Sequence, residues 1–219
     1  MPPTVLFDFD GTLVRGDSGA RFLKAMIEPS LPRRVLALAG VPLLLPAFSW
    51  WRSARAMTSA YLWLATVGRN ADELDAMRRA FIARCVGRQD ALLIAPAVQR
   101  LVGHLDAGHR VAIVTGSEER LARELWAALG GPAVPVWVGS RFRAGLGGWL
   151  PERHCFGPRK LHALAEAGIH PPFHTVYTDS ARDLPLLRHA RTPVLVAPGR
   201  STLRRVRREF GDVEVIRVR

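Results

Sequence analysis

The chain has 219 residues, of which 48% are hydrophobic and 23% are charged, a composition typical of a globular protein with a sizeable core. This length predicts one large domain or a core domain with an inserted cap. The only cysteines, Cys85 and Cys155, exclude a disulfide framework and a metal cluster built from cysteines. The start of the chain lacks the layout of a signal peptide, so we expect a cytoplasmic protein.

The formal net charge of +12 favours anionic partners, whether nucleic acid, an acidic small substrate or an anionic membrane surface. Nearly all of the basic residues are arginine, and Lys24 and Lys160 are the only lysines. Because this bias indicates genomic composition, it weakens any argument from an arginine-rich run. It strengthens an argument from a retained lysine.

The first motif follows a short apolar run, residues 5–7, that predicts a buried strand. Asp8 and Asp10 come directly after it, and Gly11 permits a sharp turn. Carboxylates at the C-terminal end of a parallel strand open into the crevice where α/β folds bind their ligands. Such a pair can hold a hard cation, and one of the two can attack phosphorus. The alternative is that these aspartates only cap the next helix.

An uncharged apolar run occupies residues 35–51. As a helix it would be ~25 Å long, whereas a straight crossing of the hydrocarbon needs ~30 Å, and Pro42 and Pro46 would kink it. The active-site residues assigned below lie both before and after this run and must meet in one compartment, which also excludes a single crossing. We therefore expect a bent re-entrant or interface-lying hairpin, with the buried helix pair of a soluble cap as the alternative.

Aromatic and basic residues accompany the apolar run. Those suited to the headgroup level of a membrane are Trp50, Trp51, Tyr61 and Trp63. Those able to attract an anionic leaflet are Arg33, Arg34, Arg52 and Arg55.

Helices are expected over residues 17–29, 54–66 and 71–86. The last of these is amphipathic, and its apolar stripe is predicted to be core. The stripe consists of Leu74, Met77, Phe81 and Cys85, with Arg78, Arg79 and Arg84 on the opposite side.

From about residue 90 the pattern changes to short strands that alternate with helices. Strands are expected at 110–114, 134–138, 175–177, 193–197 and 213–218, and helices at 97–107, 118–129, 158–167, 183–190 and 200–209. This alternation predicts an α/β fold, a Rossmann-like doubly wound parallel sheet with helices on both faces. We expect the catalytic core to comprise residues 1–15 and 89–219, with a helical cap over 16–88 inserted after the first strand.

Two further positions in this sheet suit phosphate. Thr115 and Gly116 follow the second strand, where a hydroxyl and a backbone N–H at a helix N-terminus form a phosphate cradle. Lys160 begins a helix, where its compact ammonium can neutralise phosphate charge. Taken alone, the first motif also fits an ordinary β–α turn, and the second fits a surface lysine.

A second acidic pair, Asp179 and Asp183, follows the strand at 175–177. Asp179 can complete a Mg²⁺ site with Asp8, and Asp183 can support that site through water. The alternative for Asp183 is an ordinary acidic residue at a helix start.

Taken in order, these motifs resemble the haloacid dehalogenase superfamily of phosphohydrolases, whose motifs run Asp-x-Asp-x-Thr, then Ser/Thr, then Lys, then an acidic pair. The first of them runs here from Asp8 to Thr12, and the resemblance spans nearly the whole chain. A cap inserted after the first strand resembles the phosphoserine-phosphatase-like branch, which has a helical cap.

A closer resemblance is to the phosphatidylglycerophosphatase C family. This bacterial family removes the terminal phosphate from phosphatidylglycerophosphate at the inner membrane, and it too carries an apolar stretch in its cap. The matching stretches are Val114-Thr115-Gly116-Ser117, Gly147-Gly148-Trp149, Cys155-Phe156-Gly157 with Lys160, and the run from Tyr177 to Leu187. The cap matches only in its hydrophobic character, and Thr178 stands where the branch usually has glycine.

The resemblance implies a role for each of these residues. Asp8 is expected to be the nucleophile that forms an aspartyl-phosphate. Asp10 is expected to protonate the leaving alcohol and then to deprotonate the attacking water. The expected phosphate-binding residues are Thr12, Thr115, Gly116 and Lys160. The expected Mg²⁺ ligands are Asp8, the Asp10 carbonyl, Asp179 and, through water, Asp183.

The resulting prediction is a Mg²⁺-dependent phosphatase for phosphatidylglycerophosphate, an anionic phospholipid, at the cytoplasmic side of the inner membrane. The nearest alternative is a soluble phosphatase for phosphoserine or another small phosphomonoester, in which Asp17 and Ser18 select a polar leaving group. A nucleic-acid-binding module is disfavoured because the sequence carries no motif of that kind, and no feature of the sequence indicates an oligomeric state.

Overall fold

The computed structural model describes residues 2–44, 51–87 and 92–218, with the backbone alone described for 40–44 and 51–57. Its centre is a seven-stranded sheet in the order β4-β3-β2-β1-β5-β6-β7. The strands are β1 (Thr4–Asp8), β2 (Arg110–Glu118), β3 (Val136–Gly145), β4 (Gly148–Arg153), β5 (Phe173–Thr178), β6 (Ala190–Val196) and β7 (Glu214–Ile216). Neighbouring strands pair in parallel, except that β3 and β4 are antiparallel.

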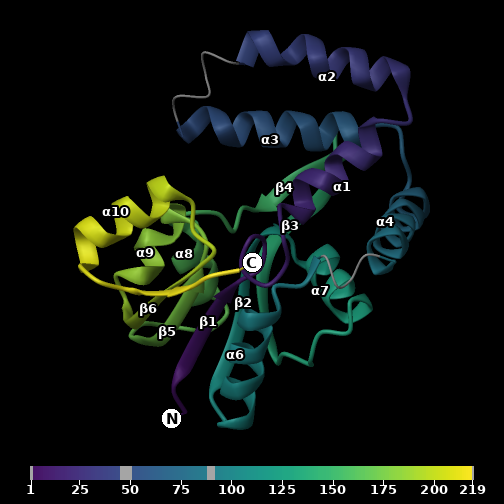
Figure 1. Ribbon diagram of the computed structural model, residues 1–219. Helices are drawn as coiled ribbons and strands as arrows, with labels where there is room; N and C mark the ends of the chain where they lie inside the picture. The colour runs from purple at the N-terminus through teal and green to yellow at the C-terminus, as the bar shows by residue number, and fades with distance from the viewer. Residues whose placement is uncertain (1, 45–50, 88–91, 219) are drawn as a thin grey trace.

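Helices cover both faces of this sheet (Figure 1). The helices of this part of the chain are α6 (Ala95–Asp106), α7 (Glu119–Ala128), α8 (Arg159–Glu166), α9 (Leu184–Leu187) and α10 (Arg200–Phe210), with a 3₁₀ turn, η2, at Ala181–Asp183. Helices α6 and α7 share one hydrophobic core, and α8, α9 and α10 share the other. The predicted α/β fold is therefore confirmed.

Strand β1 is buried on both faces, which explains why its sequence is continuously apolar. Val5 and Phe7 point into the core beneath α6 and α7, whereas Leu6 points into the core beneath α8 and α9. Phe7 stacks on Tyr177 of β5 with the ring centroids 4.2 Å apart. This packing fixes β1 at the centre of the sheet.

The order of the strands reverses at β1, because β1 pairs with β2 on one side and with β5 on the other. Asp8 lies opposite Val114 of β2, and Phe7 lies opposite Tyr177 of β5. The residues that follow these three strands therefore emerge at one edge of the sheet. In open α/β sheets this is the place where ligands bind.

One edge of the sheet differs from the prediction. A parallel strand was expected over 134–138, but β3 continues to Gly145 and turns back into β4. The turn uses residues with positive φ, namely Leu146 at 52° and Gly147 at 73°. Beyond Ser140 the hairpin is only partly buried, so its sequence lacks the run of apolar residues that marks a central strand.

In the described part of the chain between β1 and α6 lie the helices α1 (Ser18–Ile27), α2 (Leu31–Leu44), α3 (Trp51–Thr66) and α4 (Ala71–Val86). Helix α1 begins where expected, because the Asp17 carboxylate caps it by accepting a hydrogen bond from Ala20 N at 2.8 Å. Helices α2 and α3 lie side by side beyond the edge of the sheet where β1 ends, and α4 lies beside α7 (Figure 1).

Residues 35–44 of the apolar run belong to α2, and Trp51 begins α3. Helix α2 continues through Pro42 to Leu44, and Pro46 and Trp50 lie outside the described residues. Among the helices that the structure describes, none is long and apolar enough to cross a membrane.

The position of Arg78 on α4 was predicted wrongly. The capping box of Asn70 and Glu73 starts this helix. The sequence pattern placed Arg78 on the polar side of the helix, opposite the apolar stripe, but its side chain is buried and only 1% exposed. Its guanidinium pairs with Asp75 at 2.6 Å and with Glu124 of α7 at 2.8 Å. The arginine is buried because α7 covers this side of α4.

Candidate active site

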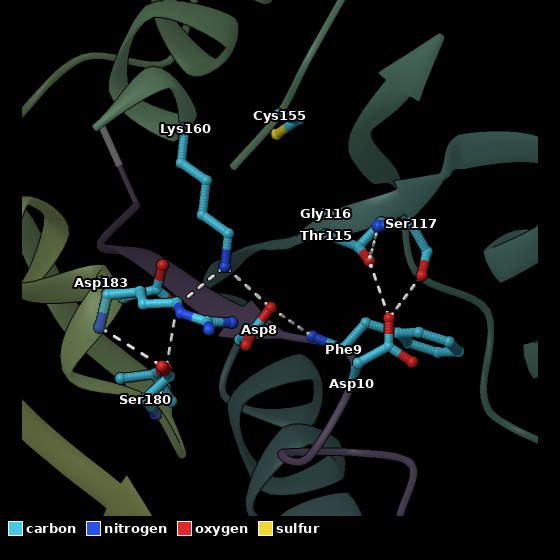
Figure 2. A network of polar contacts seen from close by, with 12 residues as sticks. Asp8, Phe9, Asp10, Thr115, Gly116, Ser117, Cys155, Lys160, Ser180 and Asp183 are labelled. Atoms are coloured by element: carbon cyan, nitrogen blue, oxygen red, sulfur yellow. Dashed lines mark hydrogen bonds and ion pairs between the residues drawn. The ribbon is translucent and has the colours of Figure 1, made fainter. Parts of the chain in front are cut away.

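Three charged side chains meet at the end of β1 (Figure 2). Lys160 Nζ donates to Asp8 Oδ1 at 2.8 Å and to Asp183 Oδ2 at 2.7 Å. All three side chains are largely buried, with exposed fractions of 4%, 11% and 3%. The backbone N–H of Phe9 donates to the same Asp8 oxygen at 2.9 Å. The other oxygen of Asp8, Oδ2, has no hydrogen bond to any described residue.

Local structure fixes Lys160 and Asp183 in this position. Gly157, with a φ of 56°, and Pro158 precede α8 and place Lys160 in its first turn. Asp183 ends η2, and the Thr178 hydroxyl donates to Asp183 Oδ2 at 2.8 Å. Thr178 stands where the phosphoserine-phosphatase-like branch usually has glycine. Its hydroxyl therefore anchors the Asp183 carboxylate, which in turn holds Lys160.

Burial and the neighbouring charges shift the pKa values of Asp8 and Lys160. It raises the pKa of Asp8 to about 8, against the opposing attraction of Lys160. Burial alone would lower the pKa of Lys160, but Asp183 and Asp8 together raise it above its usual range. Lys160 is therefore a permanent cation beside a carboxylate whose ionisation depends on further positive charge, which a bound cation would supply.

The Asp10 carboxylate lies apart from this group and is held by hydroxyl and amide donors (Figure 2). Ser117 Oγ donates to its Oδ2 at 2.6 Å, and Ser18 N donates to its Oδ1 at 2.7 Å. The Thr115 hydroxyl lies 3.4 Å from Oδ2. Burial raises the pKa of Asp10, and the hydrogen bonds from Ser117 and Ser18 oppose the shift. A carboxyl group with a raised pKa can carry a proton near neutral pH.

An irregularity in β2 brings Ser117 to Asp10. Between Val114 and Glu118, β2 advances four residues while its partner β3 advances two, from Val138 to Ser140. Thr115, Gly116 and Ser117 thus form a bulge within the strand, whereas a turn into a helix had been predicted. Bulges of this kind redirect side chains next to functional sites.

Gly19 allows Ser117 to reach the first turn of α1. Its N–H donates to Ser117 Oγ at 3.0 Å, and a Cβ at position 19 would lie 2.7 Å from that oxygen. The hydroxyls of Ser18 and Ser117 are 3.2 Å apart. The start of α1 is thereby joined to the same hydroxyl that holds Asp10.

Asp179 lies against the turn that follows β1. Gly11 has a φ of +79°, and a Cβ at this position would collide with the Asp179 carboxylate. Burial and the neighbouring Asp183 raise the pKa of Asp179. The carboxylates of Asp8 and Asp179 both line the cavity described below, and they are hard oxygen donors of the kind that Mg²⁺ prefers.

Within the described residues, no three or more His, Cys, Asp or Glu side chains are grouped so as to enclose a metal ion. The predicted donor set does not need such a group, because it combines two carboxylates with a backbone carbonyl. Mg²⁺ usually keeps several water ligands and takes one or two protein carboxylates. The residues present therefore fit Mg²⁺.

The predicted phosphate-binding residues differ in whether they reach the cavity or are buried beneath it. Thr12 and Thr115 are fully buried, and neither belongs to the wall of the cavity described below. Thr12 Oγ1 has no hydrogen-bond partner in the described part of the chain. Gly116 does line the cavity, and a Cβ there would lie 3.0 Å from the Phe156 ring, so a larger residue would require that ring to shift.

A cavity of about 1120 Å³ connects these residues to the helices that follow β1. Its polar end contains Asp8, Asp10, Lys160, Asp179 and Asp183. Residues of α1, α2, α3 and the β3–β4 hairpin line much of the rest, together with Arg15, Arg159 and Arg182. Cys155 is buried and does not line the cavity, and burial raises the pKa of this thiol to about 12, so it stays protonated.

The structure thus brings most of the predicted site residues to one place. Asp8, Asp10, Gly116, Lys160 and both members of the second acidic pair line one cavity, and Thr12 and Thr115 lie beneath it. Sequence reasoning missed Ser18 and Ser117 as contacts of the Asp10 carboxylate and Thr178 as a contact of the Asp183 carboxylate. Ser117 belongs to the stretch Val114-Thr115-Gly116-Ser117, but the direction of its hydroxyl follows only from the bulge in β2.

Comparison with known proteins places this arrangement among hydrolases. Residues 5–188 match the family described as haloacid dehalogenase-like hydrolase. A protein of unknown function from Bordetella pertussis Tohama I has a similar solved structure, with 23% identity, a TM-score of 0.74 and 99% coverage of both chains. A phosphoserine phosphohydrolase-like protein from Francisella tularensis has 15% identity and a TM-score of 0.63, with 97% of this chain and 94% of that chain covered. A substrate-bound phosphoserine phosphatase has 14% identity and a TM-score of 0.59, with 99% and 93% covered. At these identities the solved structures show a shared fold.

Proposed function

The chain belongs to the haloacid dehalogenase-like hydrolase family, and we propose that it is a Mg²⁺-dependent phosphomonoester hydrolase that works through an aspartyl-phosphate. The observation that carries this proposal is the Asp8–Lys160–Asp183 group. It presents a carboxylate oxygen at the end of β1 beside a buried lysine that can neutralise an incoming phosphate. Asp8 Oδ1 is held by Lys160 and by Phe9 N, which leaves Oδ2 as the attacking atom.

In the first step, Asp8 Oδ2 attacks phosphorus and the bond from phosphorus to the leaving oxygen breaks. The Asp10 carboxyl gives its proton to that oxygen, so an alcohol leaves and Asp8 carries the phosphoryl group. Lys160 and the Gly116 N–H bind the phosphoryl oxygens. The raised pKa of Asp10 favours the protonated form that this step requires.

In the second step, a water attacks phosphorus and gives its proton to the Asp10 carboxylate. The bond from phosphorus to Asp8 breaks, inorganic phosphate leaves, and Asp10 regains the protonated form with which it started. Ser117 and Ser18 hold Asp10 through both steps, because each carboxyl oxygen accepts one of their hydrogen bonds and keeps a second lone pair for the proton.

Asp8, the Asp10 carbonyl and Asp179 would hold Mg²⁺, with Asp183 supporting the site through water. Bound there, Mg²⁺ supplies positive charge that keeps Asp8 ionised and offsets the repulsion between Asp8 and the phosphate.

We propose phosphatidylglycerophosphate as the substrate, on the basis of the motifs shared with the phosphatidylglycerophosphatase C family. The outer face of α2 supports a lipid substrate. Leu31, Val35 and Leu38 follow one another at helical spacing and are 68%, 56% and 69% exposed. Exposed apolar rows of this kind bind membrane interfaces or protein partners. We assign residues 16–88 to a cap that contacts the cytoplasmic face of the inner membrane through α2, and residues 1–15 and 89–219 to the catalytic core.

One of the basic residues expected at this contact has a different role. Arg33 donates to the carbonyls of Leu64, Ala65 and Val67, so it caps the C-terminal end of α3 instead of facing a membrane. Arg34, beside it, is exposed and remains available to an anionic surface. The side chains of Arg52 and Arg55 lie outside the described residues.

The experiment that tests this function compares phosphate release from phosphatidylglycerophosphate in mixed micelles with release from phosphoserine, each with Mg²⁺ and with EDTA. We expect Mg²⁺-dependent release that favours the lipid. Release from phosphoserine alone would support the soluble phosphatase, which the fold shared with phosphoserine phosphatases also allows. Asp8→Asn is the control: it should abolish turnover and keep the folded circular-dichroism spectrum, because Lys160 retains Asp183 as its partner.

A further inference from the structure

The cavity at the active site is larger and more apolar than a small polar phosphomonoester requires. Pockets for small molecules have volumes of ~300–1,000 Å³, and this one measures about 1120 Å³. A phosphate bound at Asp8 and Lys160 would fill only its polar end. The rest of the space is bounded by α1, α2, α3 and the β3–β4 hairpin.

The walls of this remaining space are mainly hydrocarbon. Met26 and Ile27 of α1 and Leu62 of α3 line it and are buried, with exposed fractions of 2%, 8% and 1%. Trp149 of β4 also lines this space. The hydroxyl of Tyr61, another lining residue, donates to the Ala37 carbonyl at 2.9 Å and is therefore already satisfied.

Two of the charged residues that line the cavity away from Asp8 and Lys160, namely Asp17 and Lys24, also have partners. Asp17 caps α1 through Ala20 N, and Lys24 pairs with Glu28 at 3.5 Å. A polar leaving group that entered the apolar part would lose its hydrogen bonds to water, whereas a hydrocarbon chain would gain from burial.

We infer that the cavity takes a hydrocarbon chain of the phosphorylated substrate into the protein, between α1, α2 and α3, while its phosphate lies at Asp8 and Lys160. This inference rests on the proposed hydrolysis of phosphomonoesters and names the class of substrate, an amphiphile with a phosphate at one end. Leu38 lines the cavity and also belongs to the exposed apolar row on α2, so the cavity opens beside the face proposed to meet the membrane.

The test uses n-alkyl phosphates from ethyl to dodecyl, each below its critical micelle concentration and without detergent or membrane. For the wild-type protein, kcat/KM should rise by up to about fourfold per added methylene, the equivalent of ~0.8 kcal/mol, and then level off when the cavity is full. A value of kcat/KM that is independent of chain length would overturn the inference.

A matched pair of variants locates the chain. Ala37 lines the cavity and is half-buried, and its contact with Tyr61 is made by the backbone, so Ala37→Trp fills space without removing that hydrogen bond. Ala39, on the same helix, is exposed and does not line the cavity, so Ala39→Trp is the control. Ala37→Trp should lower kcat/KM for decyl phosphate by about tenfold or more and leave ethyl phosphate nearly unchanged. Ala39→Trp should change neither.

The outcomes separate this inference from the proposed function. Hydrolysis of every alkyl phosphate at one chain-independent rate would keep the phosphatase and remove the chain site. Equal loss for both substrates in Ala37→Trp would show that the tryptophan acts on the fold instead of on chain binding, and it would also count against the inference. Absence of turnover with all alkyl phosphates and with phosphatidylglycerophosphate would instead refute the proposed function.

Discussion

Ser117 Oγ donates a hydrogen bond of 2.6 Å to Asp10 Oδ2, which ties the bulge in β2 to the loop after β1. The same Ser117 oxygen accepts a hydrogen bond from Gly19 N at the start of α1. One hydroxyl thus joins the proposed acid–base residue to the first helix of the proposed cap. The orientation of Asp10 therefore depends on where α1 sits.

This relationship predicts a leaving-group effect in Ser117→Ala. The variant keeps the Ser18 N–H on Asp10 but loses the hydroxyl that fixes Oδ2. Loss of one hydrogen bond to a charged group should lower kcat/KM for an alkyl phosphate, a parameter that reports the first step, about tenfold, the equivalent of ~1.4 kcal/mol. An aryl phosphate such as p-nitrophenyl phosphate, whose leaving group needs no proton, should be affected much less. Equal losses on both substrates would show that Ser117 has only a structural role.

The proposed metal site predicts a Mg²⁺ effect in Asp179→Asn. The amide is nearly isosteric with the carboxylate, so the contact with Gly11 is kept while one negative oxygen donor is lost. The Mg²⁺ concentration that gives half-maximal rate should rise by about tenfold or more, and added Mg²⁺ should partly restore the rate. Asp72→Asn, an exposed substitution on α4, is the control. An unchanged Mg²⁺ requirement in Asp179→Asn would remove Asp179 from the ligand set.

The buried Arg78 predicts a loss of stability that its neighbour does not share. Arg78→Ala leaves Arg120 as the remaining partner of the Asp75 and Glu124 carboxylates and opens a cavity between α4 and α7. Because these carboxylates are 28% and 36% exposed and keep some water, we expect a loss of about 2–3 kcal/mol, below the usual range for a fully buried pair. Arg79→Ala removes an exposed arginine from the next position and should change stability by about 0.5 kcal/mol or less. Urea denaturation measures both, and equal effects would contradict the role given to Arg78.

The environment of His104 predicts how stability changes with pH. Burial, reinforced by the neighbouring His109, lowers the pKa of His104 to about 4. An unfolded histidine titrates near ~6.5, so below that pH the unfolded chain takes up a proton that the folded protein does not. The stability associated with His104 is therefore complete above about pH 6.5 and is lost as the pH falls toward 4.

Replacement of His104 by glutamine should flatten the decline in stability between about pH 6.5 and 5. His170→Gln, which removes one exposed imidazole, is the control. The free energy of unfolding, measured by urea denaturation across this range, decides the matter. An equal slope in wild type and His104→Gln would show that His104 does not govern this part of the profile.

The central part of the site was predictable because local sequence determines it. Strand β1 is apolar on both faces and ends at Asp8, and parallel pairing then brings the ends of β2 and β5 beside it whatever lies between them. The contacts that sequence reasoning missed depend on distant partners. Ser117 reaches Asp10 only because β3 sets the bulge in β2.

Other errors have the same origin. Arg78 fits an exposed helix face by its spacing, and it is buried because Glu124, 46 residues later, lies opposite it on α7. The β3–β4 hairpin escaped prediction because its outer half is exposed and rich in glycine and arginine. The periodicity of apolar residues identifies a helix or strand that packs against a core. Contacts such as that between Arg78 and Glu124 depend instead on how the elements pack together.

The central claim, that Asp8 carries the phosphoryl group during turnover, is tested most directly by trapping it. Wild-type protein and Asp8→Asn would be mixed with substrate and Mg²⁺, quenched in acid within the first turnover, digested and mapped by mass spectrometry. We predict phosphate on Asp8 in the wild type and none in Asp8→Asn. With p-nitrophenyl phosphate, whose leaving group needs no proton, Asp10→Asn should carry more phosphate on Asp8, because only the second step then lacks its base. Normal phosphate release with no phosphate on Asp8, or with phosphate on another residue, would contradict the account.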